Sequence, residues 1–113
     1  MINLSIRAMS EMLANQQVSL QELCGVFSDR TKAFNQKTQA LITINSELDA
    51  AEILQAQSLI SQGGHILAGI PMVHKDLFCT DGVKTTCGSK MLANFIPPYN
   101  ATVVQKLADQ GMV

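Results

Sequence analysis

Two short apolar segments limit what this chain can fold into. Residues 41–45 read Leu-Ile-Thr-Ile-Asn, and residues 70–78 form a second, mostly apolar run that Gly69 and Pro71 introduce. Both segments are too short for a typical helix, and the first is rich in β-branched side chains, which favour strands. The sequence therefore predicts β-strands over about 41–45 and 70–78.

The remaining segments show the periodicity of amphipathic helices. Ser19 and Glu22 form an S-x-x-E capping box, which predicts the start of a helix, and Gly63-Gly64 predicts the end of another. Asn100 is expected to cap the last helix. The helices are predicted over about 5–15, 19–36, 46–62 and 101–110.

Helices that alternate with short strands indicate an α/β fold in which helices pack on a mixed sheet. The length of 113 residues suits one domain and is too short for two. Two or three strands are too few to cover all the predicted helix faces, and Met112-Val113 begins a further apolar segment. We therefore expect the chain to be truncated, the first part of a larger α/β domain.

The charge pattern argues against direct nucleic-acid binding. The net charge is −1 and aromatic residues make up only 4% of the chain, whereas nucleic-acid binding needs a basic surface and stacking side chains. No apolar stretch approaches the ~20 residues that span a bilayer. Cys24, Cys79 and Cys87 form no C-x-x-C pair, and with no secretory signal pattern this favours a cytoplasmic location.

His74, Cys79 and Cys87 are the one set of side chains that suggests a zinc site. Structural zinc sites usually combine ligand pairs two to four residues apart with four ligands in total. The sequence shows neither feature here, so we expect ordinary thiols and no metal.

Lys75 lies in the middle of the second predicted strand, where a charge is unexpected. Alternation places it on the same face as the apolar residues Val73 and Leu77. One interpretation is a gatekeeper, a charge that discourages pairing with other molecules. The other is a buried base, because an ordinary lysine keeps its proton up to pH ~10.4 and only an apolar site makes a neutral amine available near pH 7. The residue pattern alone leaves both interpretations open.

Three sequence stretches favour the interpretation of Lys75 as a base, because they resemble a known family. They are LAGIPMVHKD (67–76), GVKTTCGSKML (82–92) and PPYNATVVQKL (97–107). They resemble the amidase signature family, and the similarity extends over the whole chain. Asn100 stands where the family commonly has aspartate, and either residue can cap a helix. The resemblance implies an α/β/α sandwich with a mixed sheet, of which residues 1–113 form the N-terminal segment of a single amidase domain.

The family also implies a Ser–cis-Ser–Lys catalytic triad, in which the lysine of the Lys-Asp pair is the base. In this sequence that residue is Lys75. Both serines belong to a glycine- and serine-rich segment that is expected after residue 113. Ser89 is no substitute, because its loop is not the nucleophile region in the family. The 113 residues alone are therefore expected to be inactive.

Within the family, residues 85–92 and 97–104 are most similar to the A subunits of glutamyl-tRNA(Gln) amidotransferases. That similarity implies a glutaminase that releases ammonia from glutamine for the conversion of Glu-tRNA(Gln) to Gln-tRNA(Gln). Its partners would be B and C subunits, with ATP and magnesium on the B subunit and no cofactor in this one. The alternatives are a stand-alone amidase of the same family and a non-catalytic fragment with a packing or assembly role.

Overall fold

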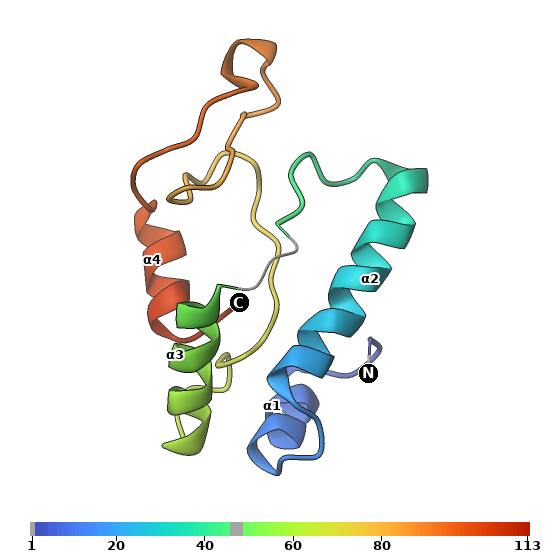
Figure 1. The fold of residues 1–113 in the computed structure, drawn as a ribbon, viewed down its shortest axis with the longest axis vertical. Helices are drawn as coiled ribbons and strands as arrows, with labels where there is room; N and C mark the ends of the chain where they lie inside the picture. The colour runs from blue at the N-terminus through green and yellow to red at the C-terminus, as the bar shows by residue number, and fades with distance from the viewer. Residues whose placement is uncertain (1, 46–48) are drawn as a thin grey trace.

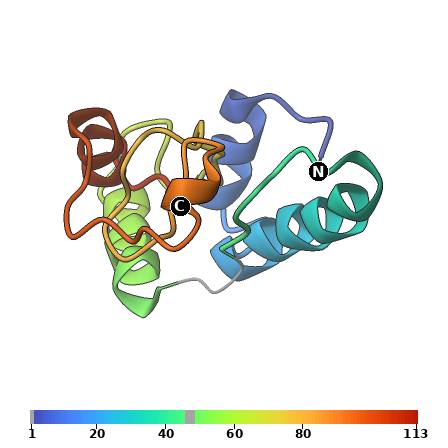
Figure 2. The same cartoon turned by 90° about the horizontal axis from the view of Figure 1, so that it is seen from above.

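The computed structural model describes residues 2–45 and 49–113, and within them the regular structure is helical (Figure 1). The α-helices are α1 (Ile6–Ala14), α2 (Leu20–Thr38), α3 (Ala50–Ser61) and α4 (Thr102–Asp109), with one 3-10 turn, η1 (Lys90–Leu92). Figure 1 shows α1 and α2 on one side and α3 and α4 on the other, with the extended chain around residue 70 between them. The same separation is visible from above in Figure 2.

Local hydrogen bonds set most of the helix boundaries. Ser5 Oγ accepts the Ala8 N–H at the start of α1. The capping box at the start of α2 is complete, because Ser19 Oγ accepts the Glu22 N–H while the Glu22 carboxylate accepts the Ser19 N–H. Helix α2 continues to Thr38, beyond the predicted end at residue 36.

The third and fourth helices begin differently from the predictions. Asp49 caps α3 by accepting the Ala51 N–H at 2.8 Å, and the predicted start at residues 46–48 lies outside the described residues. Helix α4 is preceded by Ala101, which makes no side-chain cap. Asn100, the expected cap, instead accepts the backbone N–H of Asp81 at 2.8 Å. A bond to a distant part of the chain has replaced the local one.

The core lies where α1, α2 and α3 meet the chain that follows α3. Leu23 and Ala56 are completely buried, at 0% exposure. The buried cluster consists of Met9, Leu13, Leu20, Leu23, Cys24, Ala56 and Ile70. Helices α1, α2 and α3 each contribute buried residues of an apolar face, as their periodicity predicts.

Gly69 allows the backbone to pass through the centre of this cluster. Its φ angle is +76°, and a Cβ atom there would lie 2.9 Å from Leu20 Cδ1 and 3.1 Å from Leu13 Cδ1 and Ile60 Cδ1. These three side chains belong to α2, α1 and α3. Only a residue without a side chain fits both the backbone conformation and the space.

Neither predicted strand forms within residues 2–45 and 49–113, and this corrects the expectation for 41–45 and 70–78. At 41–45 the Asn35 side chain holds Leu41 through both its backbone groups, at 2.8 and 2.9 Å. The run after residue 70 stays extended only briefly, because the carbonyl of Lys75 accepts the N–H groups of Leu77 and Phe78, which forms a turn.

A fragment of strand pairing nevertheless exists beside residue 71. Val113 donates its N–H to Ile70 O at 3.1 Å and accepts the Met72 N–H at 2.9 Å. Val113 thus accepts from the residue after position 71 and donates to the residue before it. This pattern of two bonds is a parallel β-bridge between residues 71 and 113. A strand needs such bonds along its whole length, whereas the described residues supply one parallel rung here and an isolated antiparallel bridge between Thr80 and Val83. The α/β/α sandwich is therefore not formed by these residues.

No helix in residues 2–45 and 49–113 has the length and apolar character needed to cross a membrane.

The close packing around Gly69 yields a stability prediction. In the variant Gly69→Ala the new methyl group meets three buried side chains, and alanine disfavours a positive φ. We expect the free energy of unfolding to fall by about 2 kcal/mol or more, as a shift of the urea midpoint.

Gly25→Ala is the matched control. Gly25 lies inside α2, and nothing lies within 4 Å of a Cβ atom placed there. This variant should be more stable than the wild type by about 0.5–1 kcal/mol. Equal stability of Gly69→Ala and the wild type would contradict the packing described here.

Candidate active site

Lys75 lies beside a large hollow in the structure. A cavity of about 870 Å³ is lined by parts of α2 and α4, by residues 40–45, by Thr80 and residues 83–85, and by the chain at 71–76, which includes Lys75. The lysine side chain itself is exposed. Its predicted apolar neighbours are exposed as well, Val73 to 66% and Leu77 to 44%.

This exposure differs from the buried amine that a base requires. The expected burial depended on a regular strand with covered faces, and the turn after Lys75 ends the extended segment before a sheet can cover it. Within residues 2–45 and 49–113 the Lys75 side chain is therefore exposed and not enclosed in an apolar site.

Asp76, the second residue of the Lys-Asp pair, binds a turn beside this cavity through both its carboxylate oxygens. Its Oδ1 accepts the backbone N–H of Thr86 at 2.8 Å. Its Oδ2 accepts the Thr86 hydroxyl and, at 3.3 Å, the backbone N–H of Gly88. The hydroxyl bond and then the backbone bond of Thr86 hold the pKa of Asp76 below its usual value. We call this set of bonds between Asp76 and residues 86–88 the Asp76 clasp.

The partner of the clasp is itself well fixed. Thr85 and Thr86 are the buried polar residues of the described chain, at 4% and 5% exposure. Thr85 donates its N–H to Phe95 O at 3.1 Å, and Gly82 donates its N–H to Pro97 O at 3.0 Å. The segment at 82–85 is thus tied to the returning chain at 95–97.

Residues 86–89 form a tight turn. Ser89 donates its N–H to Thr86 O at 2.9 Å, and the two central residues, Cys87 and Gly88, have φ angles of +53° and +66°. Two positive φ angles in succession are typical of a type I′ turn. The turn directs the Gly88 N–H toward Asp76.

Ser89 has a structural partner in this loop. Its Oγ accepts the Met91 N–H at 3.2 Å and so caps η1.

His74, Cys79 and Cys87, the residues considered for zinc, do not come together as a ligand set. Within residues 2–45 and 49–113 no group of three or more His, Cys, Asp or Glu side chains is placed to hold a metal ion. Cys79 Sγ instead lies 3.6 Å from the hydroxyl of Tyr99. Burial lowers the pKa of His74, and burial raises the pKa of Cys24 to about 11.

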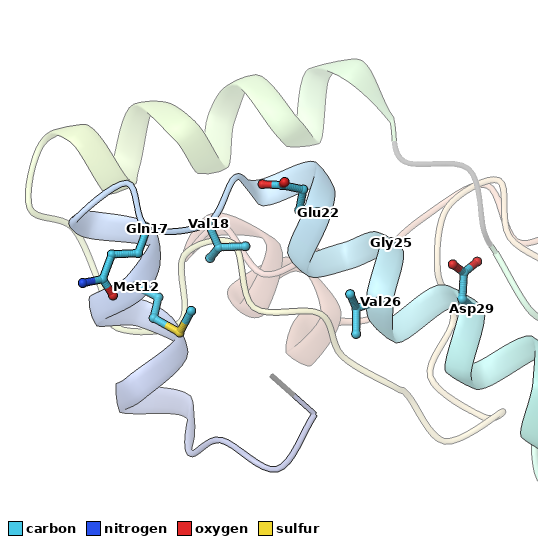
Figure 3. A pocket seen from close by; sticks show the side chains of 7 residues that line it. All are labelled: Met12, Gln17, Val18, Glu22, Gly25, Val26 and Asp29. Carbon is cyan, nitrogen blue, oxygen red and sulfur yellow. The ribbon is translucent and has the colours of Figure 1, made fainter.

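A second cavity, of about 590 Å³, lies at the junction of α1 and α2 (Figure 3). Its lining combines apolar and polar side chains from both helices and their connection: Met12, Gln17, Val18, Glu22, Gly25, Val26 and Asp29. The Glu22 carboxylate there already accepts the N–H and the hydroxyl of Ser19, at 2.9 and 2.6 Å. The Glu22 carboxylate therefore serves the capping box, whereas the 870 Å³ cavity is bordered by Lys75, the site residue predicted from the sequence.

Most of the chain matches a known family. A family model described as Amidase matches residues 22–113, a range that includes Lys75 and the Asp76 clasp. The chain therefore belongs to the amidase family, as the resemblance of its three sequence stretches implied.

Curated relatives, each named as the A subunit of a glutamyl-tRNA(Gln) amidotransferase, are similar along the whole chain. The chain is 45% identical to the relative from Nitrosomonas eutropha, over all of this chain and 24% of that protein. It is 48% identical to the relative from an Azoarcus species, over all of this chain and 23% of that protein. For Thiobacillus denitrificans the identity is 47%, over 96% of this chain and 22% of that protein. The chain thus spans about a quarter of the length of these relatives.

The Asp76 clasp predicts how stability depends on pH. The folded state lowers the pKa of Asp76, so the unfolded chain takes up the proton first as the pH falls. The stabilisation is complete above the ordinary aspartate pKa of ~3.9 and is lost as the pH falls through the lower folded value. Asp76→Asn lacks this contribution at every pH.

We therefore expect the wild type to be more stable than Asp76→Asn at pH 7, and the difference to shrink below about pH 4. Urea unfolding from pH 7 to pH 2.5 measures it. Asp81→Asn, which removes an exposed carboxylate nearby, should leave the pH profile close to that of the wild type. A difference between wild type and Asp76→Asn that stays constant with pH would count against the clasp.

Proposed function

We propose that this chain supplies the general base of a glutamine-hydrolysing amidase, and that the base is Lys75. The observation that carries the proposal is the placement of Lys75: its carbonyl is held by a turn, the next residue is held by the Asp76 clasp, and its side chain borders the 870 Å³ cavity. Membership of the amidase family supports it, because that family uses a lysine in this position.

The proposed reaction needs a neutral lysine. Lys75 takes a proton from the bridging serine, which takes one from the nucleophilic serine, so that the latter attacks the side-chain amide carbon of glutamine. The C–N bond breaks, the proton passes to the leaving nitrogen as ammonia forms, and water then releases glutamate from the acyl-enzyme. Backbone N–H groups would stabilise the oxyanion. Both serines would come from the glycine- and serine-rich segment of the family.

We further propose that the enzyme is the A subunit of a glutamyl-tRNA(Gln) amidotransferase acting in the cytoplasm. The support is the identity of 45–48% to the relatives named above. Ammonia would pass to a B subunit that carries ATP and magnesium, and Glu-tRNA(Gln) would be bound by the complex with its C subunit.

The single parallel rung at Val113 supports the proposal of an α/β/α sandwich. Residues 70–72 and 113 would be neighbouring strands of its mixed sheet, with α4 as the connection between them. Residues 1–113 would form the N-terminal segment of one amidase domain.

A chimaera tests the role of Lys75. Residues 1–113 replace the matching quarter of the Nitrosomonas eutropha relative, which is produced with the other subunits of that enzyme, and ammonia release from glutamine is measured. We expect the chimaera to be active and Lys75→Ala to lose activity by about 10² or more, because the nucleophile has no proton acceptor.

Lys75→Arg separates a base from a gatekeeper. Arginine keeps the positive charge but does not release its proton at working pH, so the activity should fall almost as far as in Lys75→Ala. A gatekeeper would tolerate arginine. Near wild-type glutamine hydrolysis by Lys75→Arg, or an inactive but folded unsubstituted chimaera, would contradict the proposed function.

A further inference from the structure

We propose that Asp76 is a positioning residue for Lys75, holding the backbone of the lysine and the turn at 86–89 together as one rigid unit. The proposal rests on the proposed function, in which Lys75 is the base. It concerns a different residue and a different kind of contact from the triad itself.

The geometry of the Asp76 clasp is the first support for this role. Both carboxylate oxygens are used: Oδ1 by the Thr86 N–H at 2.8 Å, and Oδ2 by the Thr86 hydroxyl and the Gly88 N–H. Two oxygens that bind three donors from one turn fix the carboxylate in position and orientation. Asp76 directly follows Lys75, so the same bonds fix the peptide plane that carries the lysine.

The burial of the donors is the second support. Thr86 is 5% exposed, so its N–H and hydroxyl would lose their acceptors without gaining water if the carboxylate were removed. A buried donor without a partner is unfavourable, and the turn would move to satisfy it. The Gly88 N–H, which also contacts Thr86 Oγ at 3.2 Å, would move with it.

The third support is that the other bonds of Lys75 and of the turn are independent of each other. The Lys75 carbonyl is held by Leu77 and Phe78, which follow it closely in sequence. The turn is held through Thr85, which bonds to Phe95. The Asp76 clasp joins these two fixed pieces, and a misplacement of about 1 Å at a catalytic group can reduce a rate 10²-fold.

Asp76 acts through this scaffold and not on the substrate. Its two carboxylate oxygens already accept hydrogen bonds from Thr86 and Gly88, so they are engaged in holding the turn at 86–89. A positioning residue of this kind should affect the rate of the chemical step more than the binding of glutamine.

The experiment compares three substitutions in the chimaera. Asp76→Asn replaces one accepting oxygen by a donor, and Thr86→Val removes the hydroxyl while leaving the N–H. Each should lower kcat by about 10- to 100-fold with KM changed less than about threefold. Thr86→Ser keeps the hydroxyl and should retain most of the wild-type kcat.

The matched control is Asp81→Asn. Asp81 lies in the same region and bonds through its backbone N–H to Asn100, while its exposed carboxylate accepts no hydrogen bond within residues 2–45 and 49–113. Its kcat and KM should stay near those of the unsubstituted chimaera. The double variant Asp76→Asn with Thr86→Val should lose less than the product of the single losses, because both remove one contact.

The outcomes separate this inference from the proposed function. If Lys75→Ala is inactive while Asp76→Asn behaves like Asp81→Asn, the positioning role is wrong and the base remains. If Lys75→Ala keeps its activity, the proposed function is wrong. Asp76→Asn could also lose activity only because less of the enzyme folds, with kcat per folded molecule unchanged. That result would show a purely structural role and overturn the inference. If Asp76→Asn does not fold, the milder variant Thr86→Val takes its place, and its kcat per folded molecule decides between the same outcomes.

Discussion

The pairing of Gly69–Met72 with Gly111–Val113 is the contact on which the rest of the structure depends. Gly69 donates its N–H to Gly111 O at 2.7 Å, and the bonds between Val113 and residues 70 and 72 continue the contact. It brings the end of α4 to the centre of the helical core. Gly111 fits there because a Cβ atom would lie 2.8 Å from Leu59 Cδ1. Two glycines at the crossing thus let two backbones approach where side chains would separate them.

The same contact positions the candidate site. Residues 73–75 directly follow this pairing and border the cavity, with Lys75 at their end. Helix α4 is held against α3, where Gln55 Nε2 donates to Ala108 O at 3.2 Å, and the chain before α4 includes the returning segment that supports Thr85. The loop at 79–101 is therefore connected to the core through residues 70–78 before it and through α4 after it.

The helices could be predicted from the sequence because their signals are local. The capping box of Ser19 and Glu22 and the spacing of Met9 and Leu13 lie within a few residues of the structures they specify. The strands were predicted wrongly within the described residues, because a strand depends on a partner that can lie far away in sequence. Ile70 and Met72 find only Val113 within that part of the chain, and Leu41 is held by the Asn35 side chain instead.

The candidate site also combines a feature that the sequence indicates locally with one that depends on distant residues. The Lys-Asp pair drew attention to Lys75, but the residue pattern allowed a gatekeeper or a base, and only the resemblance favoured the base. The Asp76 clasp could not be predicted, because Asp76 and Thr86 are distant in sequence and nothing local links a carboxylate to a particular threonine. The adjacent threonines at 85 and 86, small polar residues in a loop, were the available hint.

A crystal structure of the chimaera would test the proposed role of Lys75 most directly. The distance to measure joins Lys75 Nζ to the nearest serine Oγ of the glycine- and serine-rich segment. We predict about 3 Å, within hydrogen-bond reach, with the lysine enclosed and the Asp76 clasp intact. A Lys75 side chain that extends into solvent, with no serine beside it, would contradict its assignment as the base.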